Sequence, residues 1–113
     1  MTAMDSFLTH LGLCFRAGKL AVGEEPVRLA LAGGQARVVF IAADASERTR
    51  RKLEPKLGNV PLETLPATKA ATGGALGRES CAICAVTDKG FAQSLSQRLS
   101  QAPNAHPDGG VTI

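Results

Sequence analysis

Apolar residues recur at helical spacing near both ends of the chain. The first set falls at i, i+3, i+4 and i+7, which predicts an amphipathic helix over residues 4–17. Gly18 follows at the position where helices commonly end. A second set predicts a last amphipathic helix. The two sets are Phe7, Leu8, Leu11, Cys14 and Phe15, and then Phe91, Leu95 and Leu99.

Three shorter runs have the character of strands. Val38–Ala43 and Cys81–Thr87 are continuous apolar segments rich in β-branched residues, which predicts strands that are covered on both faces. Residues 60–65 predict a third strand, and Pro61 near its start favours an edge position because proline cannot donate to a neighbouring strand.

Helices are predicted between these strands. One begins after Gly23 and stops at Gly33-Gly34, a second is capped by Ser46 and ends or kinks at Pro55, and a third, weakened by glycine, covers residues 68–76. This alternation predicts the α/β class, as a three-layer α/β/α sandwich with a small, mostly four-stranded mixed sheet.

Length and composition predict one domain and a tail. The 113 residues suffice for one core, over residues 1–101, while residues 102–113 turn to Pro, Asn, Gly and His and are predicted to be disordered. Four Phe with no Trp or Tyr argue against an aromatic platform for single-stranded RNA. We find no membrane span and no signal peptide, so a cytoplasmic location is expected. Three cysteines then argue against a disulfide framework.

Motifs for catalysis or cofactor binding are weak. Cys81 and Cys84 match Cys-x-x-Cys, but residues three apart in a strand point to opposite faces, so we expect neither a shared metal nor a redox dithiol. Gly73-Gly74 lacks the Gly-Lys-Ser/Thr of a phosphate loop. No nucleophile–base constellation is evident, and helix-dipole matching explains Glu24 and Glu25. The sequence therefore predicts no enzyme, cofactor or metal, and no catalytic residue.

Basic residues gather around the start of the second helix. The segment from Arg16 to Gly23 reads as a basic turn, which places helix N–H groups beside Arg16, Lys19 and Arg28. Backbone donors and cations grouped in this way suit a polyanion. The net charge of +3 and a pI near 9.0 agree mildly with an RNA partner.

Several separated segments resemble one family in order and spacing. They are Gly23-Glu24-Glu25-Pro26-Val27 leading to Gly34, VVFIAADAS from Val38, Val60-Pro61-Leu62, the stretch from Gly73 to Gly77, and AVTDKGFA from Ala85. Together they resemble the kink-turn-binding ribosomal L-seven-Ae superfamily, and in particular its bacterial YlxQ-like branch, over roughly residues 5–100. The resemblance implies an α/β/α sandwich that binds structured RNA through the start of its second helix and the loop before its last strand.

The resemblance and the basic residues together indicate a candidate RNA-binding set. Its members are Lys19, Gly23, Glu24, Glu25, Arg28, Asp44, Lys69, Gly77, Arg78 and Glu79. Glu25, Pro26 and Leu29 stand where archaeal members have Asn, Glu and Lys. We therefore expect recognition dominated by phosphate contacts and RNA shape, with Lys19, Lys69 and Arg78 around the same end of the sheet.

Several alternatives remain open from the sequence. The chain is predicted to be a monomeric, non-catalytic binder of kink-turn-like or ribosomal RNA. It could instead be the RNA-holding domain of a fused or partner RNA-modifying enzyme, or a protein–protein adaptor without RNA affinity. The third helix carries Arg48, Arg50, Arg51, Lys52 and Lys56, and this basic face is either simply solvated or a second RNA contact.

Overall fold

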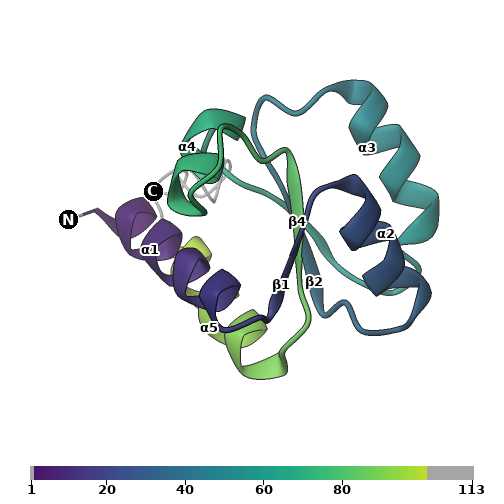
Figure 1. Cartoon of the computed structure of the whole chain (residues 1–113), viewed down its shortest axis with the longest axis horizontal. Helices are drawn as coiled ribbons and strands as arrows, with labels where there is room; N and C mark the ends of the chain where they lie inside the picture. Colours follow the sequence, from purple (N-terminus) through teal and green to yellow (C-terminus); the bar gives the residue numbers. More distant parts are fainter. Residues whose placement is uncertain (1, 102–113) are drawn as a thin grey trace, which may run out of the picture.

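A small mixed sheet lies between two layers of helices (Figure 1). The computed structural model describes residues 2–101, and the tail predicted for residues 102–113 lies outside them. The elements in chain order are α1 (Ala3–Arg16), β1 (Leu20–Val22), α2 (Glu24–Ala32), β2 (Val38–Ile41), α3 (Glu47–Leu53), the 3-10 helix η1 (Glu54–Lys56), β3 (Leu62–Thr64), α4 (Lys69–Ala75), β4 (Ile83–Val86) and α5 (Lys89–Ser100).

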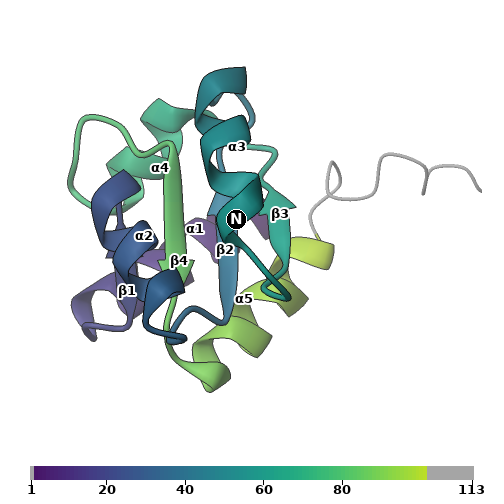
Figure 2. The same ribbon diagram turned by 90° about the vertical axis from the view of Figure 1, so that its right-hand side faces the viewer.

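The sheet has the strand order β1-β4-β2-β3 (Figure 2). β2 and β3 are parallel, and β4 runs antiparallel to both β1 and β2. The predicted mixed four-stranded sheet is therefore confirmed. β3 occupies an edge, as Pro61 just before it predicts.

Alternate residues of the central strands point into two different cores. Val38 and Phe40 of β2 pack under α1, α4 and α5, where Phe7 meets Phe40 edge-to-face at 5.2 Å between ring centroids. Val39 and Ile41 pack under α2 and α3. All four residues of β2 are buried, so this strand is covered on both faces as its continuous apolar run predicts.

The segment from Arg16 to Gly23 is not only a turn, as the sequence suggests, but contains strand β1. Leu20 pairs with Val86 and Val22 pairs with Cys84, antiparallel to β4. Leu20 and Val22 are both buried, with one half-buried residue between them. A three-residue strand offers only one period of alternation, which is too short to stand out from a loop.

Local signals place the ends of the helices correctly. The Ser46 side chain accepts a hydrogen bond from the backbone N–H of Thr49 at 3.1 Å and caps α3. α3 ends at Leu53, and the next three residues, including Pro55, continue as η1 because proline lacks the N–H that the α-helical pattern needs.

Candidate functional site

Four connections meet at one end of the sheet. β1, β2 and β3 end there, and β4 begins there, because β4 alone runs in the opposite direction. Gly23 follows β1, Asp44 follows β2, Lys69 follows β3, and residues 77–82 precede β4. We call this the loop end of the molecule; it carries most of the residues expected to contact RNA.

Hydrogen bonds hold these connections together. The Asp44 Oδ1 atom accepts from the Lys69 backbone N–H at 2.7 Å, which ties the β2–α3 loop to the start of α4. The Lys69 carbonyl in turn accepts from the Cys81 N–H at 2.9 Å, and the Ala82 carbonyl accepts from Ala42 at 2.8 Å. The loop end is thus a connected surface rather than a set of independent loops.

Gly23 makes the sharp entry into α2. Its φ of 101° lies in a region that side-chain-bearing residues rarely adopt, and its own N–H donates to the Ile83 carbonyl at 3.1 Å. No side chain caps the first turn of α2, so its leading N–H groups are open to an external acceptor. The anion-binding role expected for this helix start stays a prediction.

Glu24 and Glu25 form two separate ion pairs near this helix start. The Glu25 carboxylate binds the Arg28 guanidinium through two hydrogen bonds, which lowers the pKa of Glu25 and raises that of Arg28. Glu24 reaches across to α3, where its Oε1 atom lies 3.1 Å from the Lys52 Nζ atom. All four side chains are roughly half exposed or more, so the pairs order the surface more than they stabilise the fold.

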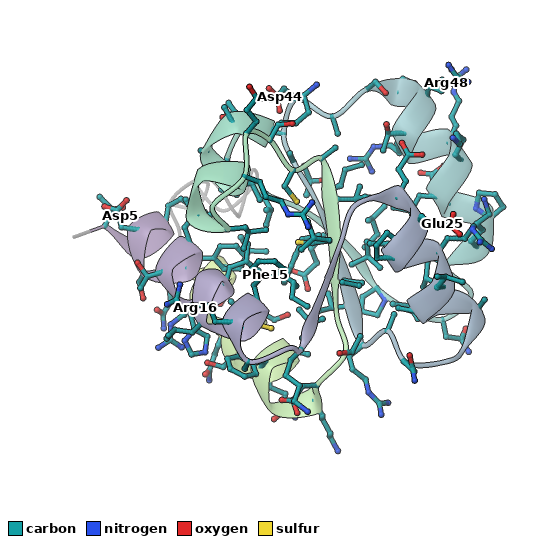
Figure 3. The ribbon with its side chains drawn as sticks, in the orientation of Figure 1. Asp5, Phe15, Arg16, Glu25, Asp44 and Arg48 are labelled. Carbon is teal, nitrogen blue, oxygen red and sulfur yellow. The ribbon has the colours of Figure 1, made fainter. Side chains whose placement is uncertain are left out.

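These pairs line a cleft between α2 and α3. The cleft has a volume of about 120 Å³, and charged and polar side chains of both helices surround its apolar residues, Leu53 and Ile83. Glu25 projects from α2 toward the α3 side, on the right of the molecule in Figure 3. Arg28 therefore belongs to this cleft rather than to the loops of the loop end.

The loop before β4 is shaped by glycine. Gly77 has a φ of 73°, which allows the chain to turn back from α4. Gly73 of α4 lies against Ser80, and a Cβ atom at position 73 would meet the Ser80 Cα atom at only 2.5 Å. Arg78 then extends over the Phe15 ring, with its guanidinium carbon 5.7 Å from the ring centroid, which keeps the cation at the surface beside α1.

Lys19 lies at the opposite end of the sheet from Lys69 and Arg78. It precedes β1, and its carbonyl accepts from the Thr87 N–H, just after β4, at 3.0 Å. The three residues of β1 lie between it and Gly23, so the two Cα atoms are about 13 Å apart along extended chain. The expectation that Lys19 shares an end of the sheet with Lys69 and Arg78 is therefore wrong, because the segment between Lys19 and Gly23 is a strand and not a turn.

The cysteine pair also differs from expectation. Cys81 and Cys84 were expected on opposite faces, yet both are buried in the core cluster under α1, α4 and α5. β4 begins only at Ile83 and the chain bends at Ala82, so the strand alternation does not extend back to Cys81. The Cys81 thiol donates to the Ile83 carbonyl at 3.3 Å, and the interaction between the two neighbouring thiols lowers the pKa of Cys81 and raises that of Cys84.

Among residues 2–101, no group of three or more His, Cys, Asp or Glu side chains is arranged to hold a metal ion. Within the same part of the chain, no helix is long and apolar enough to cross a membrane.

Sequence reasoning missed two residues that shape this region. Gly73 carries no signal beyond its glycine-rich neighbourhood, because its close contact with Ser80 depends on how α4 packs. Lys52 was visible only as one of five cations on a basic helix. Its partner Glu24 is 28 residues away, and no local pattern could have paired them.

Curated proteins similar to this chain carry one name. The chain is 36% identical over 101 residues to the RNA-binding protein YlxQ of Bacillus subtilis (strain 168), covering 88% of this chain and 99% of that protein. It is 30% identical over 89 residues to the RNA-binding protein YlxQ of Enterococcus faecium, covering 79% and 86%. No protein-family model matches the chain.

Solved structures show the same architecture. A protein with unknown function from Bacillus halodurans superposes with a TM-score of 0.77 at 32% identity, over 83% of this chain and 96% of that one. The 15.5kD RNA binding protein of Giardia lamblia gives a TM-score of 0.68 at 15% identity, over 88% and 87%. The second likeness shows a shared fold. The two YlxQ proteins confirm the YlxQ-like part of the resemblance that the separated motifs indicate, and the Giardia lamblia structure agrees in fold.

Proposed function

Because this chain belongs to the family of YlxQ proteins, whose curated relatives are named RNA-binding proteins, we propose that it binds structured RNA at the loop end of its sheet. The target class we propose is a kink-turn-like or ribosomal RNA. The part of the chain in contact with it comprises the start of α2, the start of α4 and the loop before β4.

The convergence of these three segments carries the proposal. Gly23 and Arg78 are 55 positions apart in sequence, and Lys69 lies between them. The strand directions nevertheless bring the three segments to the loop end of the sheet. The first-turn N–H groups of α2 have no side-chain cap, and such groups bind phosphate oxygens well. Lys69 at the start of α4 and Arg78 in the loop before β4 add two cations at the same end of the sheet, with the Arg78 guanidinium over the Phe15 ring.

The chemistry of this surface favours shape over base reading. Pro26 has no donor and only an apolar ring, and Glu25 is already bound to Arg28. Neither side chain is free to form the bidentate hydrogen bonds that read a base edge. A bent RNA presents closely spaced phosphates from two strands to one protein surface, and the loop end offers donors and cations on loops that are hydrogen-bonded to one another.

Binding to a bent and a straight RNA tests the proposal. One probe is a hairpin with a three-nucleotide bulge beside two sheared G·A pairs, and the other is a fully paired hairpin of equal length. We expect tighter binding to the bent hairpin, and about tenfold weaker binding to it for Lys69→Ala and Arg78→Ala, because each removes one charge-assisted contact. Lys89→Ala, at the opposite end of the sheet, is the matched control.

The same measurement separates the other functional classes. Equal affinity for the two hairpins in all three variants would contradict a site at the loop end and leave only general attraction to polyanions. No RNA binding, together with a stable protein partner, would favour the adaptor. A monomeric, cytoplasmic and non-catalytic protein remains our proposal for the chain, and an RNA-holding domain beside an RNA-modifying enzyme would bind the same probes.

A further inference from the structure

The net positive charge of the chain is concentrated on one short segment. Residues 47–56, which form α3 and η1, contain five Lys or Arg and two Glu and therefore carry a charge of +3. The whole chain carries +3 as well, so the other residues hold equal numbers of acidic and basic side chains. The excess of positive charge, which attracts a polyanion over a long range, therefore lies on α3 and η1.

The cations of this segment differ in how they are held. Arg50 turns toward β3 and donates to the Thr64 hydroxyl at 2.9 Å, and Lys52 is paired with Glu24. Arg51 lies 3.4 Å from Glu47, but the Arg51 side chain is 76% exposed. Arg48 is exposed, and within residues 2–101 it makes no ion pair. Arg48 and Arg51 are therefore available to an external anion.

Spacing places the cations in a row. Arg48 and Lys52 are four residues apart, which puts them on one side of α3. Lys56 of η1 is exposed and lines the same cleft as Lys52. Arg48 lies on the same edge of the molecule as Asp44, at the top of Figure 3. The row therefore starts near the loop end and runs away from it beside α2, with α2 and α3 side by side in front of the sheet (Figure 2).

The Lys52–Glu24 pair connects this row to the start of α2. It neutralises one of the two first-turn carboxylates, and Arg28 neutralises the other. Without these partners, Glu24 and Glu25 would repel phosphates from the helix start. Arg48 and Arg51 of α3 lie next to these ion pairs, on the side along which a nucleic acid that extends from the loop end would pass.

We propose that α3 and η1 form a second RNA contact, in which Arg48, Arg51 and Lys56 bind the phosphates of a stem that extends from the RNA held at the loop end. This inference rests on the proposed function and adds a separate surface to it. Contacts of this kind bind any stem sequence, so they add affinity and salt dependence without adding discrimination between bent and straight RNA.

The test compares two lengths of the bent hairpin. The short form ends about four base pairs from the bulge, and the long form continues for about ten more. The variant Arg48→Gln/Arg51→Gln removes two charges from α3, and Arg37→Gln/Lys89→Gln removes two exposed cations at the opposite end of the sheet. Affinity is measured across a series of salt concentrations, and far-UV circular dichroism checks that each variant is folded.

We expect the α3 variant to bind the long hairpin on the order of tenfold more weakly, with a slope of log K against log salt that is shallower by about 1.5. Its affinity for the short hairpin and its preference for bent over straight RNA should stay as in the unaltered chain. Equal losses in the α3 and control variants, or no loss in either, would overturn this inference alone. Equal binding of bent and straight hairpins by the unaltered chain would instead overturn the proposed function.

Discussion

Replacing Gly73 by alanine should destabilise the protein even though alanine is the better helix former. Gly73 is buried in α4 with ordinary helical backbone angles. A Cβ atom there would lie 2.5 Å from the Ser80 Cα atom, 2.6 Å from its nitrogen and 2.7 Å from its carbonyl carbon. All three are backbone atoms, so no side-chain rotation relieves the contact. Either α4 or the loop before β4 must move.

Gly74, the next residue, is a matched control for the magnitude. A Cβ atom at Gly74 meets nothing within 4 Å, so Gly74→Ala should stabilise the fold by about 0.5–1 kcal/mol through helix propensity alone. Gly73→Ala gains the same amount and loses about 1–3 kcal/mol to overpacking. The difference between the two variants isolates the steric cost, and we expect a net destabilisation of about 1–2 kcal/mol for Gly73→Ala.

Urea unfolding followed by far-UV circular dichroism is the suitable assay, since the chain contains neither Trp nor Tyr. With a slope of about 1–2 kcal/mol per molar urea, the two midpoints should differ by about 1 M. Because Ser80 belongs to the loop end, Gly73→Ala should also weaken binding to the bent hairpin, and Gly74→Ala should not. Equal midpoints for both variants would refute the close packing of α4 against the loop.

Two other predictions concern charge and thiols. Glu25→Gln removes the partner of Arg28 and should strengthen RNA binding severalfold, with a slope of log K against log salt that is steeper by about 1. Weaker RNA binding by this variant would mean that Glu25 itself contacts RNA. Burial raises the pKa of Cys14 to about 12, and the neighbouring Cys81 thiol raises that of Cys84, while the pKa of Cys81 is lowered. As the pH rises from 7 to 9, a thiol reagent should therefore modify Cys81 first, as followed by mass spectrometry of peptides, and reaction of all three at one rate would contradict these environments.

Most of the fold could be predicted because its elements are long or strongly patterned. The buried runs around β2 and β4 stand out from any loop, and Ser46 and Pro55 mark the ends of α3 by mechanisms that act within one helical turn. β1 could not be found in this way. Its three residues become a strand only because β4 supplies an antiparallel partner more than 60 positions later.

The same reason explains the errors in the candidate site. The expected position of Lys19 followed from treating residues 16–23 as a turn, and the strand carries it to the other end of the sheet. The expected separation of Cys81 and Cys84 assumed strand alternation two residues before β4 begins. In both cases the positions of the residues depended on pairing with distant parts of the chain, which a local pattern does not contain.

The ion pairs at the start of α2 decide where attraction for RNA must come from. Two adjacent glutamates in a first turn would normally keep phosphates away, although they suit the helix dipole. Glu25 is paired within α2 and Glu24 is paired from α3, so the side chains at the helix start carry no net charge instead of a negative one. Its open N–H groups can then select an RNA by shape, but they supply little long-range attraction. That attraction has to come from cations on either side, Lys69 and Arg78 toward α4 and the row on α3. Variants of these flanking cations should therefore reduce affinity more than neutral substitutions in the first turn of α2.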